Sequence, residues 1–91
     1  MDGMLLRVKI SGMVQGVFFR HSARLKAQEL GLNGFIRNES DGSVYSEAEG
    51  TKEKLDEFLE WCRKGPPLAS VDKVDFSFDK SHREFSGFEI R

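Results

Sequence analysis

The sequence is poor in cysteine, in proline and in net charge. Its 91 residues include a single cysteine, Cys62, so no disulfide can form within the chain. The two histidines lie far apart in the sequence and have no cysteine partners, which leaves no Cys/His cluster with metal-ligand spacing. A formal net charge of −1 gives no general basic surface for nucleic acid or acidic lipid. Any anion must therefore be bound by a local group of residues.

Long apolar runs are also missing. The N-terminal apolar stretch is interrupted at Arg7, so we expect neither a signal peptide nor a membrane span, and we expect a cytoplasmic location. Apolar residues make up 38% of the chain and charged residues 32%, which is typical of a folded globular protein. We expect residues 1–91 to fold as one domain that is held by its hydrophobic core alone. No strong interface patch is visible, so a monomer is expected.

Period-two alternation of apolar and polar residues predicts several short strands. The alternation is clearest in Leu6–Ile10 and Val74–Phe78. Two further strands, Gly34–Asn38 and Ser43–Ala48, flank an Asp-Gly step, which is a hairpin signal. In the strand that follows the turn, we expect alternate residues to face the core and the others to face outward. The expected core-facing residues are Val44, Ser46 and Ala48, and the expected outward-facing residues are Tyr45, Glu47 and Glu49.

Apolar residues at helical spacing predict two helices. The first carries its apolar face in Ala23–Leu30 and ends at Gly31. The second carries its apolar face in Leu55–Cys62, with Thr51 as its expected N-cap, and the sequence Gly65–Pro67 stops it.

The order of these elements predicts the fold. Strand, helix, strand, strand, helix, strand is the pattern of an α+β, ferredoxin-like β-α-β-β-α-β sandwich, and we expect a short extra strand within Phe85–Arg91. Both helices would pack on one face of an antiparallel sheet. Folds of this kind also bind RNA, through exposed aromatic residues on a basic sheet face. Glu47 and Glu49 would repel RNA here, so we expect no nucleic-acid partner.

The segment GMVQGVFFR (Gly12–Arg20) connects the first strand to the first helix. Its glycines let the backbone bend toward a ligand, and loop amides beside a helix N-terminus can converge on an anion. A cation at Arg20 is unfavourable to the helix dipole, but it is well placed to bind a doubly charged anion. The alternative is structural: Arg20 would lie at the surface, the Gln15 side chain would only brace the loop, and four apolar side chains would pack beneath it, namely Val14, Val17, Phe18 and Phe19. The spacing alone leaves both interpretations open.

Asn38 ends the strand before the hairpin turn. Taken alone, it fits ordinary turn chemistry. It belongs, however, to the stretch GFIRNESDGSVYSEAEG (Gly34–Gly50). Together, this stretch and Gly12–Arg20 resemble the two signatures of the acylphosphatase family, and the resemblance covers nearly the whole chain. Residues that fall where the family has them are Gly34, Phe35, Arg37, Asn38, Gly42, Val44 and Gly50. Ile36 is slightly larger than the small apolar residue expected at its position.

The resemblance implies the same sandwich fold and the hydrolysis of small acyl phosphates to a carboxylate and inorganic phosphate, without metal or cofactor. It implies that Arg20 and Asn38 are catalytic, with Asn38 positioning the attacking water. The implied phosphate-binding residues are Gln15, Gly16, Val17, Phe18, Phe19 and Arg20. We therefore expect a phosphate or sulfate anion to bind in the loop. Similar domains occur in larger enzymes that handle carbamoyl phosphate, so carbamoyl phosphate stays open as a substrate.

Two further side chains have a functional and a structural interpretation. His21 follows Arg20 and would be either an acid–base group or, as we expect, a solvated or capping residue of the first helical turn. Cys62 lies on the apolar face of the second helix, where we expect a buried, inert thiol and not a reactive one.

Overall fold

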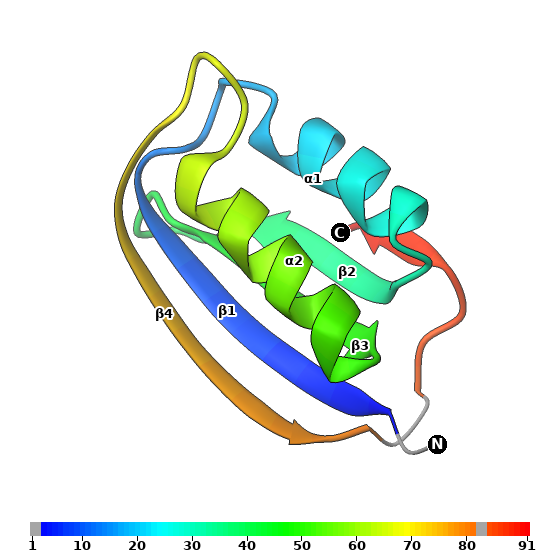
Figure 1. Cartoon of the computed structure of the whole chain (residues 1–91). Helices are drawn as coiled ribbons and strands as arrows, with labels where there is room; N and C mark the ends of the chain where they lie inside the picture. Colours follow the sequence, from blue (N-terminus) through cyan, green and yellow to red (C-terminus); the bar gives the residue numbers. More distant parts are fainter. Residues whose placement is uncertain (1–2, 82–83) are drawn as a thin grey trace.

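The computed structural model describes residues 3–81 and 84–91, which form a five-stranded sheet with two helices on one face (Figure 1). The elements are β1 (Met4–Met13), α1 (Phe19–Glu29), β2 (Asn33–Asn38), β3 (Val44–Gly50), α2 (Lys52–Lys64), β4 (Ser70–Lys80) and β5 (Phe88–Ile90). The strand order is β4-β1-β3-β2-β5. The predicted ferredoxin-like sandwich is confirmed. The sheet is mixed, because β5 pairs parallel with β2 while the other neighbours are antiparallel.

The core lies between the sheet and the helices. Leu6, Val8 and Ile10 of β1 are fully buried on the helix-facing side. The register sets the predicted core-facing residues of β3 opposite them, and these are also fully buried: Val44, Ser46 and Ala48. Removing an aliphatic side chain of this size from water contributes about 1.5–3 kcal/mol. The alternation that predicted the strands therefore also fixes which side of the sheet faces α1 and α2.

Capping groups confirm the predicted end of the first helix and the predicted start of the second. α1 is followed by Gly31 at φ 71°, and the N–H of Leu32 donates to the carbonyl of Ala27 at 2.9 Å, as in a Schellman motif. At the start of α2, Thr51 Oγ1 accepts a hydrogen bond from the N–H of Lys54. Within the described ranges, neither helix is long and apolar enough to cross a lipid bilayer.

The expected exposure of Glu49 is wrong. Its side chain is on the predicted side of the sheet, away from the helices, but only 6% of the residue is exposed. The carboxylate accepts hydrogen bonds from Ser81 Oγ at 2.7 Å and from the backbone N–H groups of Glu84 and Phe85. The Phe85 ring also packs edge-on against Phe35, 5.6 Å between centroids. Residues just before β5 thus cover part of a sheet face that the alternation predicts to be open.

Gly34 provides a test of the β2–β3 packing. It has φ 153°, and a Cβ atom there would collide with the backbone carbonyl of Glu47 on β3. We expect Gly34→Ala to lower the free energy of unfolding by about 3 kcal/mol or more, because backbone strain adds to overpacking. Gly31→Ala is the matched control, since Gly31 also has a positive φ but open space around it. It should cost only about 1–2 kcal/mol. Equal losses in urea unfolding would contradict the predicted collision.

Candidate active site

The loop between β1 and α1 has an unusual backbone at its end. Gly16 has φ 75°, and Phe18, the N-cap residue of α1, has φ 63° and ψ 23°. A phenylalanine in this left-handed region is disfavoured by about 1–2 kcal/mol. Packing does not account for the conformation, because Phe18 is 72% exposed. Strained backbone of this kind tends to occur at functional sites, where the surrounding structure holds it in place.

The backbone N–H groups of this loop lie beside the start of α1. The first N–H groups of any helix have no intrahelical acceptor, and α1 has neither a side-chain cap nor an acidic residue in its first turn. Among the residues that the structure describes, no group accepts a hydrogen bond from the backbone N–H groups of residues 15–20. The partial positive charge at the start of α1 is therefore open to an anion.

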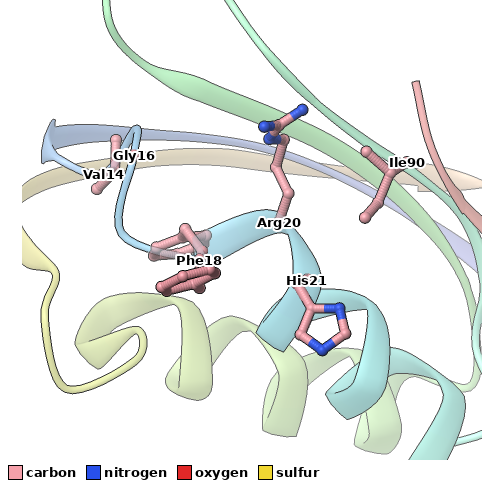
Figure 2. Close-up of a pocket in the computed structure, with 7 residues that line it drawn as sticks. Val14, Gly16, Phe18, Arg20, His21 and Ile90 are labelled. Atoms are coloured by element: carbon pink, nitrogen blue, oxygen red, sulfur yellow. The ribbon is translucent and has the colours of Figure 1, made fainter.

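A pocket of about 290 Å³ lies beside this loop (Figure 2). It is lined by Val14, Gly16, Phe18, Phe19, Arg20, His21 and Ile90. Figure 2 shows the Arg20 side chain extending away from the backbone at the start of α1, whereas the His21 ring points the opposite way. His21 is exposed, as the sequence predicted for a solvated residue. The pocket thus combines mainly apolar walls with one guanidinium group.

The Arg20 side chain is half-buried. In residues 3–81 and 84–91 it makes no hydrogen bond or ion pair, whereas Arg7, Arg37, Arg63 and Arg91 each contact a carboxylate. A guanidinium presents several donors in a planar fork that matches the oxygens of a phosphate. The loop amides and Arg20, which the sequence predicted to bind an anion, therefore lie together beside the pocket, and no acceptor within residues 3–81 and 84–91 uses their N–H groups.

Asn38 lies on the helix-facing side of the sheet, where it pairs in register with Val44. On the same side, Ile36 pairs with the pocket residue Ile90, so Asn38 is the next inward-facing position of β2 beyond the pocket wall. Its Oδ1 atom is buried and has no hydrogen-bond partner among the described residues. A buried acceptor left unpaired costs about 1–3 kcal/mol, and such groups are rare. A donor from a ligand or a water molecule would satisfy this buried oxygen.

The Gln15 side chain contacts the hairpin turn. Its Nε2 donates to the carbonyl of Glu39 at 2.8 Å and to the carbonyl of Ser43 at 2.9 Å. The sequence grouped Gln15 with the phosphate-binding residues and left open that its side chain only braces the loop. The structure shows the bracing contact, with acceptors 24 and 28 residues away along the chain. No sequence pattern indicates these acceptors.

The same turn is held from its other side by an ionic cluster. Asp41 accepts hydrogen bonds from the backbone N–H and the hydroxyl of Ser43, and it forms an ion pair with Lys9 of β1 at 2.7 Å. The hydrogen bond from Lys9 lowers the pKa of Asp41 well below its usual value, and the same contact raises the pKa of Lys9. The turn that follows Asn38 is therefore also held by contacts that do not involve the phosphate loop.

The apolar residues of the loop also have the structural role that the sequence left open. Phe19 is fully buried and meets the Trp61 ring edge-on at 5.3 Å, and Val17 packs against the core. These side chains anchor the loop while its backbone faces the pocket.

Cys62 is fully buried, and burial raises the pKa of its thiol, as expected for an inert cysteine. No group of three or more His, Cys, Asp or Glu side chains in the described part of the chain could hold a metal ion.

Comparison with known proteins identifies the family. Residues 6–90 match the sequence model of one protein family, whose description is Acylphosphatase. The chain belongs to the acylphosphatase family. An acylphosphatase of Acaryochloris marina is 51% identical over 85 residues, which cover 93% of this chain and 90% of the relative. The predicted resemblance is therefore confirmed.

Solved structures of this family have the same fold. An acylphosphatase from Coxiella burnetii superposes with a TM-score of 0.91 at 39% identity, covering 99% of this chain and 94% of the other. An acylphosphatase from Bacillus subtilis gives a TM-score of 0.93 at 31% identity, covering 97% and 98%. This acylphosphatase-family chain is accordingly a hydrolase that acts on acyl phosphates.

Proposed function

We propose that the substrate's phosphoryl group binds between the loop amides of residues 15–20 and the Arg20 guanidinium, and that Asn38 positions the water that attacks it. The observation that carries this proposal is the buried, unpaired Oδ1 of Asn38 on the side of the sheet that also bears the pocket. The unused donors of Arg20 and of the α1 N-terminus support it, because they supply positive charge where the phosphoryl oxygens would lie.

The chemistry requires positioning and charge stabilisation more than proton transfer. Phosphoryl transfer passes through a loose transition state in which charge is spread over the equatorial oxygens. Donors that are already in place stabilise this charge without reorganisation, and a fixed water converts the attack into an effectively unimolecular step. Arg20 and the loop amides serve the first purpose, and Asn38 serves the second.

The bond changes can be assigned to atoms. The water oxygen attacks phosphorus, and the bond between phosphorus and the carboxyl oxygen breaks with its electron pair leaving on the carboxylate. Asn38 Oδ1 accepts a hydrogen bond from the water, but an amide cannot take a proton at neutral pH. The proton of the water therefore passes to a phosphoryl oxygen of the substrate. A carboxylate is a good leaving group, so the reaction needs no strong general acid, and we propose that it proceeds without a metal ion.

The proposal extends to partners and location. We propose that phosphate or sulfate binds in the loop, and that the protein is a cytoplasmic monomer that binds neither nucleic acid nor membranes. The free thiol of Cys62 is suited to a reducing compartment. On the outer sheet face, the Tyr45 hydroxyl donates to Glu47 at 2.6 Å, which places a carboxylate beside the aromatic ring that RNA would have to stack on.

Hydrolysis assays test the proposed function. We expect the native protein to hydrolyse acetyl, benzoyl and carbamoyl phosphate in the presence of EDTA, with inorganic phosphate as a competitive inhibitor. Release of phosphate would be measured against the spontaneous rate for each substrate, because acyl phosphates hydrolyse slowly by themselves. Activity that EDTA abolishes and a divalent cation restores would overturn the metal-independent mechanism. Inhibition by phosphate that is not competitive would place the phosphoryl group elsewhere.

A further inference from the structure

We propose that Gln15 is a positioning residue: its carboxamide holds the β2–β3 turn against the phosphate loop and thereby fixes Asn38 relative to the bound phosphoryl group. This inference rests on the proposed function and assigns to the Gln15 side chain a task distinct from binding phosphate.

The contact joins the two halves of the site. Gln15 lies within the phosphate loop, and its Nε2 donates to the carbonyl of Glu39, the residue directly after Asn38. The second hydrogen of the same nitrogen is directed to the carbonyl of Ser43, directly before β3 begins. Both donors of the amide group are therefore used on the backbone of one turn. With both hydrogens donated to the turn, Nε2 has no donor left for the oxygens of a phosphoryl group.

The turn does not depend on Gln15 for its closure. The N–H of Glu39 donates to the carbonyl of Ser43 at 2.8 Å, and the carboxylate of Asp41 holds Ser43 and Lys9 from the other side. What Gln15 adds is a link between the turn and a loop that lies more than twenty residues earlier in the sequence. Without this link, Asn38 and the loop amides would each remain ordered, but their separation would vary.

Such variation would affect the rate more than substrate affinity. Reacting groups must be held within about 0.5 Å of their productive geometry, and a misplacement of about 1 Å can lower the rate by about 10²-fold. The phosphoryl group would keep its contacts with Arg20 and the loop, so KM should change little. We expect Gln15→Ala to lower kcat by about 10-fold, which is less than the loss for a misplacement of about 1 Å because Asn38 would be shifted only part of the time.

A double-mutant cycle with Asn38 tests the proposal. Gln15→Ala, Asn38→Ala and the double variant would be compared by kcat and KM for benzoyl phosphate. If Gln15 acts through Asn38, removing Gln15 from the Asn38→Ala protein should change kcat by less than about twofold. The same 10-fold loss in both backgrounds would overturn the proposal, because the effect would then be independent of the water-positioning group. A large rise in KM or in the inhibition constant of inorganic phosphate would also overturn it and make Gln15 a phosphate ligand.

Controls separate positioning from folding. Gln28→Ala removes an exposed glutamine of α1 outside the site and should leave both kinetic constants unchanged. If Gln15→Ala fails to fold, Gln15→Met keeps the volume without the donors, and urea unfolding of each variant shows which measurements concern a folded protein. A native protein without activity would refute the proposed function and this inference together. An active native protein with additive Gln15 and Asn38 effects would refute the inference alone.

Discussion

Replacing Asn38 with alanine is expected to lower kcat by about 10²–10³-fold while KM stays within about twofold. The amide oxygen would contact the attacking water and not the phosphoryl group, so its loss removes an interaction that matters chiefly in the transition state. Steady-state hydrolysis of benzoyl phosphate, with kcat and KM determined separately, shows whether kcat falls while KM stays constant.

Stability provides a second readout for this variant. Oδ1 of Asn38 is buried and finds no partner in the part of the chain that the structure describes, which costs the folded state about 1–3 kcal/mol. Removing the amide should therefore leave the free energy of unfolding unchanged or raise it, apart from the small volume lost. Asn33→Ala is the matched control, because Asn33 lies at the opposite end of β2, where its side-chain oxygen accepts a hydrogen bond from the N–H of Gly87. It should leave kcat unchanged.

Two results would contradict the role of Asn38. A tenfold rise in KM with an unchanged kcat would show that Asn38 contacts bound substrate in the ground state. A loss of activity that parallels a loss of folded protein would show that Asn38 supports the turn and takes no part in the reaction. The combination of a slow enzyme with a stable fold is expected only if the unpaired acceptor exists for the reaction.

Local signals in the sequence predicted the elements of the fold. Gly31 and Thr51 mark helix ends because their preferences concern the backbone within a few residues. Alternation in β1 and β3 likewise predicts which side chains meet α1 and α2. The burial of Glu49 could not be predicted in this way, because its hydrogen-bond donors lie more than thirty residues later in the chain. The parallel pairing of β5 also depends on how that last segment returns to β2.

The sequence predicted which residues form the site, but it could not predict how they are arranged in space. The glycines of the loop explain its bent backbone. Phe18, however, also adopts a left-handed conformation, and nothing in the sequence around this phenylalanine predicts it. Arg20 and Asn38 each had an ordinary structural interpretation, and only the pair of signatures favoured function. The unpaired state of both side chains depends on the three-dimensional surroundings, as does the contact between Gln15 and the turn.

Arg20→Gln is expected to raise KM by about tenfold or more and to lower kcat by about 10²–10³-fold. Both constants should change because the guanidinium would contact charge that the substrate already carries and that is redistributed in the transition state. Arg20→Lys keeps the charge but loses the planar fork, so it should recover part of the affinity and less of the rate. The same assay with benzoyl phosphate measures all three proteins.

Arg24→Gln is the control for a general electrostatic effect. Arg24 is exposed one helical turn further along α1, so its replacement changes the charge of the helix equally without altering the pocket. Its kinetic constants should match those of the native protein.

Arg20→Gln should not lose stability, because removing a cation from the first turn of α1 relieves its unfavourable interaction with the helix dipole, which is worth about 0.3–1 kcal/mol. Inorganic phosphate should raise the Tm of the native protein and of Arg24→Gln, and much less that of Arg20→Gln, because only a ligand that binds the folded state stabilises it. An undiminished shift for Arg20→Gln would mean that the loop amides bind phosphate without the guanidinium, and Arg20 would then act in the transition state alone.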